Sequence, residues 1–336
     1  GLLLKSLLNY GIIHEDSLND IVDILREIYK KEIMNVLKKE NDFGTEDDFD
    51  SVYFETMFYF LKKDKLRKHY LLSLIICISL FFKKTGYMTT EEIIEYTNNS
   101  PDDLDFLWFH IWPNAYKDNS TALAKHELES GNTDLYYATE EDRGYITDLN
   151  FTINGKKVDL KYHPEHIDIC KLILNKPIKA GETITIKTPF KVKIPDARFS
   201  RLGHVDQSYM ITQWYPKPAV YDKDGWHIMP YLSQGEFYSD FGSFDVSITL
   251  PRNYTVGATG DLQNKGEIAR LNKLAEVTDT ITKFSNDMSF PLSDLSTKTL
   301  RYIQHNVHDF GWFADKRFHV LKGEVELPNT KEKVTL

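Results

Sequence analysis

The sequence predicts a mainly β protein, with saddle-like antiparallel sheets or a β-sandwich preceded by an α-helical N-terminal segment. Many short apolar stretches are separated by turn residues about every ten positions, which is typical of antiparallel sheets. The clearest is Phe244–Leu250, in which every second residue is apolar. An Asn154-Gly155 pair between two such stretches predicts a tight hairpin. Between residues 18 and 37, apolar residues instead recur with helical spacing.

The β pattern starts at Ile93 and continues to the end of the chain. Within it we expect a short helix near Ala122–Leu128 and a polar strand or loop over Gly266–Val277. After Phe244–Leu250, the turn at 251–253 leads into a return strand over 254–258. The other expected strands are Ile93–Thr97, Leu104–Trp112, Ile146–Ile153, Val158–Tyr162, Ile167–Leu174, Thr183–Thr188, Phe190–Ile194, Met288–Phe290, Leu300–Asn306 and Arg317–Gly323.

Three parts are expected along the chain: a helical segment at 1–56, a hydrophobic signal-like segment at 57–86 and a β domain at 87–336. The middle part has basic residues followed by YLLSLIICISLFF. This apolar run is short for a membrane span, which needs ~20 residues, but it suits a secretory signal if translation starts at Met57. A buried or amphipathic helix is the alternative. The signal favours a periplasmic, secreted or membrane-associated protein.

Composition and charge narrow the possible functions. At 336 residues, the chain has room for about two domains. A formal net charge of −9 with mixed signs argues against a nucleic-acid partner. Two cysteines, Cys77 and Cys170, cannot build a disulfide framework or a C-x-x-C site. The first residue is Gly1 and the last, Leu336, falls in an expected strand, so we expect a fragment of a longer protein.

Three segments carry a family resemblance. TQWYPKPAVYD, followed by GWH, QGEFYS and FGSFDVSITLP, lies between residues 212 and 251. EYTNNSPDDLDFLWFHIWPNAY precedes it at 95–116, and NVHDFGWFADKRF follows at 306–318. In this order, the segments resemble the N-terminal domain of zinc aminopeptidases related to aminopeptidase N and leukotriene hydrolase, the Bacteroidetes-like variety above all. The resemblance covers about three quarters of the chain. It implies a saddle-shaped β domain that precedes a catalytic domain, with the last residues before 336 running into the start of that catalytic domain.

The zinc chemistry of that family is not expected on this chain. Such a peptidase needs H-E-x-x-H on a helix, where two histidines bind zinc and the glutamate activates water. The nearest match is His126–Ser130, in which Ser130 replaces the second histidine. We therefore predict no catalytic residue and no metal ligand here, and zinc only in the full-length protein. The pairs His163/His166 and His305/His308 lack a third ligand and are interpreted as ordinary hydrogen-bonding residues.

One substrate-binding role follows from the resemblance. In these peptidases, a Gln followed two residues later by Glu or Gln lines the first specificity pocket and helps to hold the free amino group of the substrate. Gln213 matches the first position, whereas Tyr215 occupies the second. Tyrosine cannot supply the charge that a carboxylate offers to an ammonium group. We therefore predict Gln213 and Tyr215 as substrate-binding residues. Because Tyr215 replaces the charged residue, the sequence does not predict that the preference of the family for free amino termini is kept. A local structural role for Gln213 is equally consistent with the sequence.

These observations favour a non-catalytic substrate-cleft domain of a zinc metallopeptidase, with a peptide substrate and its own C-terminal catalytic domain as partners. An exposed apolar patch where that domain docks is then expected. The alternative is a β-sandwich module that binds carbohydrate or protein, which predicts a row of exposed rings on one sheet face. A structural role in core packing is the simpler interpretation of the aromatic residues. These are Trp214, Tyr215, Tyr221, Trp226, Tyr231, Phe237, Tyr238 and Phe241.

Overall fold

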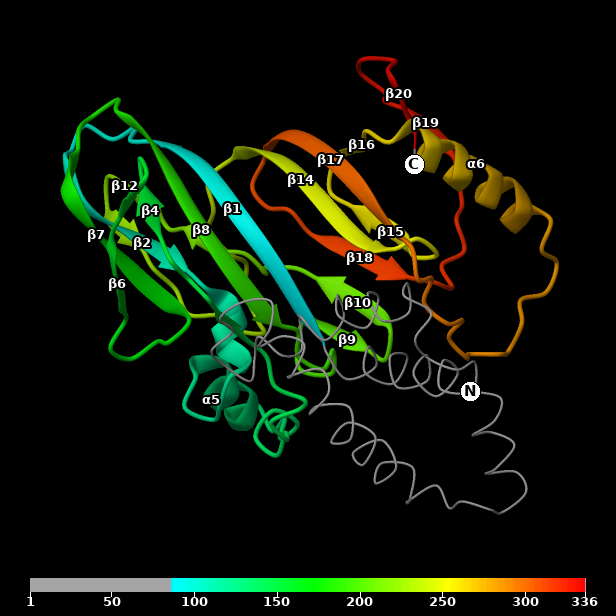
Figure 1. Ribbon diagram of the computed structural model, residues 1–336, viewed down its shortest axis with the longest axis horizontal. Coiled ribbons are helices and arrows are strands. Elements are labelled where there is room, and N and C mark those ends of the chain that lie inside the picture. Colours follow the sequence, from blue (N-terminus) through cyan, green and yellow to red (C-terminus); the bar gives the residue numbers. More distant parts are fainter. Residues whose placement is uncertain (1–85, 336) are drawn as a thin grey trace, which may run out of the picture. The chain divides into compact units, whose positions relative to one another are not determined.

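A computed structural model describes residues 86–335 of the chain (Figure 1). The chain divides between residues 84 and 85, so all of the described residues belong to the second part. The predicted helical segment at 1–56 and almost all of the signal-like segment at 57–86 lie outside the described residues. Within the described part, the predicted mainly β architecture is confirmed, because antiparallel strands dominate it. Neither of its α-helices has the length and apolar character needed to cross a bilayer.

The first sheet is built on two long strands, β1 (Tyr87–Thr97) and β8 (Thr183–Lys193), which pair antiparallel over their whole length. Buried and exposed residues alternate along β8, so one of its faces packs on the core. β1 includes the predicted strand at 93–97 and begins before it. The sheet is completed on the other side of β8 by β3 (Tyr145–Thr147), β4 (Thr152–Ile153) and β5 (Lys156–Lys157).

β8 runs through Pro189, where the sequence predicted two separate strands. Proline lacks the N–H that a central strand donates, so it is tolerated only where no ladder bond is required. β3 pairs with β8 as far as Lys191, and β4 pairs from Lys187, so no strand faces Pro189 on that side. There the hydroxyl of Thr188 accepts a hydrogen bond from the backbone N–H of Asn150 at 3.0 Å.

The Asn154-Gly155 turn closes the predicted hairpin. Both residues have positive φ, 49° and 77°, as a two-residue turn of this kind requires. The turn joins β4 to β5, with Ile153 opposite Lys156. The predicted strand at 146–153 is divided, because the residues between β3 and β4 pair with no strand and include Asp148 at φ 61°.

The second sheet has the order β11 (Lys217–Pro218), β2 (Leu104–His110), β7 (Ile169–Ile178) and β6 (Asp159–Tyr162). β2 ends at His110, earlier than predicted, because Trp112–Tyr116 forms a buried 3-10 helix (η1) with a proline in its first turn. The predicted helix at 122–128 is confirmed as α5 (Ala122–Glu129). A hairpin of β12 (Val220–Asp222) and β13 (Gly225–His227) follows β11.

Two further sheets contain the segments around the predicted strand at 244–250, which is confirmed as part of β14 (Gly242–Pro251). β14 pairs with β17 (Thr297–Val307), and β17 pairs with β16 (Asp261–Leu262). The return strand, β15 (Thr255–Ala258), joins a different sheet, with the order β15, β18 (Trp312–Asp315), β10 (Ser208–Ile211) and β9 (Gly203–Val205). The turn at 251–253 therefore leads from one sheet to another. β19 (Glu324–Glu326) and β20 (Lys333–Thr335) form a separate hairpin.

Two short predicted strands, at 288–290 and 317–323, are wrong. Side chains rather than a backbone ladder hold these segments together. The Arg317 guanidinium donates to the carbonyl of Met288 at 2.6 Å and lies 3.5 Å from the ring centroid of Phe290. The same side chain forms an ion pair with Asp315 at 3.0 Å.

The prediction of a polar strand or loop over 266–277 is also wrong, because Lys265–Asp279 forms the helix α6. Its buried residues, Glu267, Ala275 and Thr278, recur with helical spacing. Two of the three are polar, so the apolar periodicity that normally predicts a helix is weak here.

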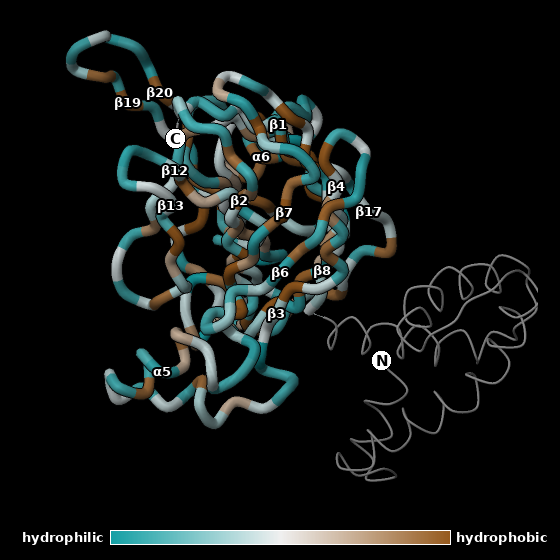
Figure 2. Tube along the Cα trace, turned by 90° about the vertical axis from the view of Figure 1, so that its left-hand side faces the viewer, coloured by the Kyte–Doolittle hydropathy of each residue, from teal (hydrophilic) through white to brown (hydrophobic). Residues whose placement is uncertain are grey.

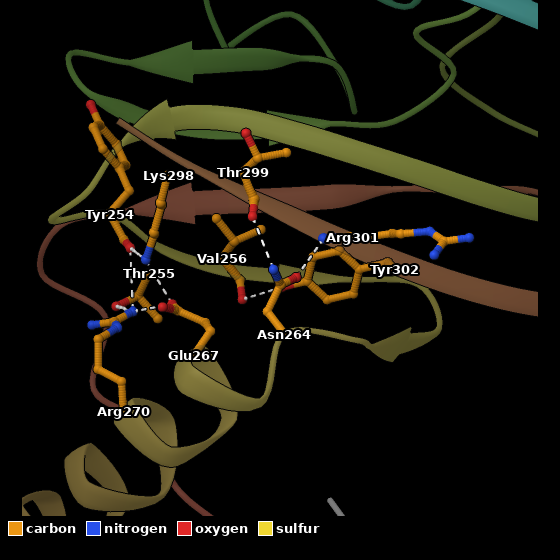
Figure 3. Close-up of polar contacts among 10 residues, drawn as sticks. All are labelled: Tyr254, Thr255, Val256, Asn264, Glu267, Arg270, Lys298, Thr299, Arg301 and Tyr302. Atoms are coloured by element: carbon orange, nitrogen blue, oxygen red, sulfur yellow. Dashed lines mark hydrogen bonds and ion pairs between the residues drawn. The ribbon is translucent and has the colours of Figure 1, made fainter. Parts of the chain in front are cut away.

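Polar contacts attach the start of α6 to β17 and to the turn after β14 (Figure 3). The carboxylate of Glu267 accepts hydrogen bonds from Arg270 and Lys298, both at 2.6 Å, and Lys298 also donates to the carbonyl of Tyr254. Asn264 donates to the carbonyl of Thr299 at 3.1 Å instead of capping the helix. Burial raises the pKa of Glu267, but the hydrogen bonds and charges of Arg270 and Lys298 outweigh it and hold this pKa below its usual value.

We expect Glu267→Gln to destabilise the protein by about 3 kcal/mol at pH 7, because it leaves buried cations without their anion. The folded-state pKa of Glu267 is lowered, so its contribution is present above the unfolded pKa and is lost as pH falls through the folded value. Urea unfolding from pH 7 to pH 3 should therefore show a steeper loss of stability in the parent than in the variant. Glu276→Gln, on an exposed position of the same helix, is the control. Equal unfolding free energies for the two variants would contradict the assignment.

Candidate functional site

Two loops that are distant in sequence meet because β10 pairs with β18. The register places Ile211 opposite Trp312, so the residues after β10 lie beside those before β18. The indole N–H of Trp214 fixes this contact by donating to the carbonyl of Phe310 at 3.0 Å. Between the loops lies a pocket of about 350 Å³. It is lined by Thr212, Gln213, Thr259, Val307, His308, Asp309, Phe310 and Gly311.

Gln213 lies in this pocket in a strained conformation. Its φ is 48°, a left-handed value that costs free energy for a residue other than glycine and is often found at functional sites. Its amide nitrogen lies 3.5 Å from Oδ2 of Asp309. Its amide oxygen is buried and has no hydrogen-bond partner. A buried acceptor without a donor is costly, so this oxygen is a polar group that the described residues leave unsatisfied.

Asp309 is held by residues from the other loop. The phenol of Tyr215 donates to Oδ1 of Asp309 at 2.7 Å, and the ammonium of Lys217 lies 3.5 Å from Oδ2. Lys217 also donates to the carbonyl of His308. Oδ1 accepts a further hydrogen bond from the backbone N–H of Phe310 at 2.8 Å. The Asp309 side chain keeps 20% of its surface exposed, whereas Lys217 keeps only 9%, so the carboxylate is the more accessible charge.

Burial and the negative charge of Asp309 determine the protonation states of Tyr215 and Lys217. Burial raises the pKa of Tyr215 well above its usual value, and the negative charge of Asp309 raises it further. Tyr215 therefore remains a neutral donor. Burial lowers the pKa of Lys217, while Asp309 opposes this change. The phenol of Tyr215 and the ammonium of Lys217 are thus both engaged by groups of the protein itself.

A partly exposed carboxylate in the pocket suits a positively charged or N–H-bearing group. The exposed part of Asp309 can accept hydrogen bonds from an ammonium group and adds charge. The structure thus brings the two predicted residues, Gln213 and Tyr215, to one place, but Tyr215 acts on Asp309 and is itself buried. Their role in binding substrate stays a prediction.

Sequence reasoning missed Asp309 and Lys217. Asp309 lies in the NVHDF segment and Lys217 in TQWYPKP, so both belong to stretches on which the resemblance depends. Nothing in the sequence indicates that these two stretches meet.

Three of the histidines considered above form hydrogen bonds with other protein groups. His163 Nδ1 is 3.2 Å from the backbone N–H of Glu165, and His305 Nδ1 is 2.9 Å from the Ser243 hydroxyl. His126 lies on α5, with its Nδ1 3.2 Å from the hydroxyl of Ser233. Among residues 86–335, no three His, Cys, Asp or Glu side chains gather as a metal site. The described residues thus bring together no ligand set for the zinc that the resemblance places only in the full-length protein.

The aromatic residues of the central stretch are divided between core and surface. Trp214, Tyr215 and Tyr231 are buried, as the core interpretation expects. Tyr238 and Phe241 are exposed, by 47% and 68%. Between these extremes, Tyr221 and Trp226 are half-buried and contact each other at 5.0 Å between ring centroids.

Comparisons with known proteins give structural neighbours only. No protein-family model matches the chain, and no similar curated protein is found. An M1 zinc metallopeptidase mutant from Deinococcus radiodurans, bound to a Tyr-Ser-Ala substrate, is 12% identical, with a TM-score of 0.36. The similarity covers 75% of this chain and 43% of that chain. A two-domain M1 zinc metallopeptidase mutant bound to L-arginine gives the same values, and one bound to L-tryptophan has a TM-score of 0.37, with 75% and 44% covered. The chain thus spans less than half the length of these neighbours.

Proposed function

We propose that residues 86–335 form the amino-terminal, non-catalytic substrate-cleft domain of a zinc-dependent metallopeptidase. The observation that carries the proposal is the pocket lined by Gln213 and Asp309, in which the Asp309 carboxylate keeps 20% of its surface exposed and the Gln213 amide oxygen has no hydrogen-bond partner. Such a pocket suits the protonated amino group at the start of a peptide. The three sequence segments that resemble zinc aminopeptidases support the same function, since two of them build this pocket.

In this proposal, Asp309 supplies the charge that Tyr215 cannot. The Tyr215 phenol positions the carboxylate, Lys217 pairs with it, and the Gln213 amide lies beside it. Lys217 partly neutralises Asp309, so the pocket attracts an ammonium group less strongly than an unpaired carboxylate would. The zinc ion and the water-activating glutamate belong to a separate catalytic domain of the full-length protein, whose predicted location is periplasmic, secreted or membrane-associated.

An exposed apolar surface supports docking to such a domain. The loop at 281–296 and the segment at 316–322 lie side by side, joined by Arg317 to Met288 and by ring contact between Phe284 and His319 at 4.5 Å. Their large apolar side chains remain in contact with water, which favours a covering partner. The most exposed are Met288 at 72%, Leu292 at 76%, Leu295 at 66% and Leu321 at 72%.

The role of Asp309 can be tested in the full-length protein with paired reporter substrates. One is an amino-acyl p-nitroanilide with a free amino group, and the other is its N-acetylated form. Asp309→Asn should raise KM for the free amine about tenfold or more, the scale of a lost hydrogen bond to a charged group, and leave the acetylated substrate unaffected. Lys217→Met should act in the opposite direction, because it removes the competing cation, and a merely damaged fold would not produce that improvement.

Asp222→Asn is the matched control, since this carboxylate also accepts hydrogen bonds from a tyrosine and a histidine but lies on the β12–β13 hairpin. It should leave both KM values unchanged. An equal rise in KM for both substrates with Asp309→Asn would show that the residue does not recognise the amino group.

We expect the 336-residue chain alone to bind no stoichiometric zinc and to cleave no amino-acyl reporter. Elemental analysis of the purified chain measures the first, and a fluorogenic assay with and without a chelator measures the second. The reading frame beyond residue 336 should encode H-E-x-x-H within about one further domain length. Chelator-sensitive cleavage by the chain alone would overturn the non-catalytic role.

A further inference from the structure

A continuous series of six rings crosses the outer side of the second sheet. Neighbouring ring centroids are separated by 5.0, 5.9, 6.4, 5.6 and 5.0 Å. Each ring is partly exposed. In order, they belong to Tyr221, Trp226, Phe106, Trp108, His163 and His166, and we call this series the ring row.

The ring row is a consequence of strand alternation on β2. Leu107 and Phe109 point into the core and are fully buried, so Phe106 and Trp108 lie on the opposite face. The outer face of an antiparallel sheet normally carries polar residues. Tyr221 and Trp226 pack partly against the hydrophobic core, whereas Phe106 and Trp108 do not belong to it, so core packing does not account for the middle of the ring row. Figure 2 shows β12 and β13 beside β2, followed by β7 and β6.

Polar side chains flank the rings on the same face. On β7, Lys171 lies between Trp108 of β2 and Lys161 of β6. Two residues along β7, Ile173 lies between Phe106 of β2 and Asp159 of β6. The Lys171 ammonium is 3.8 Å from the ring centroid of Phe106 and 4.6 Å from that of Trp108. Within the described residues, neither Lys161 nor Lys171 has a carboxylate partner, and like charges directly opposite each other are destabilising. Lys171 is thus engaged by the two rings, and the face offers the Lys161 ammonium and the Asp159 carboxylate beside them.

We propose that this face binds an uncharged polysaccharide chain. The C–H faces of sugar rings pack on aromatic rings, and their hydroxyl groups both donate and accept hydrogen bonds, so they match Lys161 and Asp159. Charge complementarity favours a neutral occupant, because Asp159 lies on the same face as the two lysines, while Asp222 at the Tyr221 end already accepts hydrogen bonds from His227 and Tyr238. A nucleic acid would require an excess of positive charge. The proposal is independent of the peptide pocket, because the two sites share no residue.

Affinity electrophoresis of the full chain tests this proposal. The gels contain xyloglucan, laminarin, dextran or soluble starch, and a heparin gel reports polyanion binding. We expect at least one neutral polysaccharide to retard the chain, and Trp108→Ala or Phe106→Ala to weaken that retardation about tenfold or more, the scale for loss of a central aromatic anchor. Trp108→Phe, which keeps a ring, should retain most of the binding. Tyr137→Ala removes a 76% exposed ring outside the row and should change nothing.

Three outcomes would overturn the proposal. They are retardation by none of the neutral polysaccharides, retardation that is unchanged in both Trp108→Ala and Phe106→Ala, and retardation by heparin alone that salt abolishes. Circular dichroism of each variant separates lost binding from lost folding. If Trp108→Ala does not fold, Phe106→Ala and Trp108→Phe decide the question.

Discussion

The pairing of β10 with β18 is the constraint on which the candidate site depends. Its register fixes where the loop after β10 meets the loop before β18, and Asp309 then joins them through Tyr215, a residue 94 positions away. Without that register, Gln213 would be one more polar residue in an aromatic stretch. With it, the glutamine oxygen and the Asp309 carboxylate share one pocket.

Local patterns predicted much of the fold because they are set by neighbours in sequence. The alternation in Phe244–Leu250 and the Asn154-Gly155 turn each correspond to one strand or one hairpin, and both occur in the structure. The partner of a strand is a different question. The segment after the turn at 251–253 pairs with β18 rather than with β14, since long-range packing and not turn chemistry selects the sheet.

Two of the wrong predictions and the missed Asp309 share a physical cause, which is that polar side chains make contacts usually made by apolar ones. α6 is attached by Glu267 and Asn264, so its buried stripe carries little apolar signal. The segment at 317–323 is held by the guanidinium of Arg317 instead of a ladder. Asp309 could not be foreseen for the same reason, because a lone aspartate in a loop gives no indication of the tyrosine and lysine that meet it.

The two binding sites proposed for this domain differ in the hydrogen-bonding groups that the protein itself leaves without a partner. In the pocket, the donors of Tyr215 and Lys217 are used within the protein, and the amide oxygen of Gln213 is left without a partner. On the outer sheet face, Lys161 and Lys171 have no anionic partner among the described residues. The pocket therefore favours a ligand that donates hydrogen bonds, and the outer sheet face favours a ligand that also accepts them. Because one alternating strand can bury one face and leave the other open, β2 supports the core on one side while it displays rings on the other.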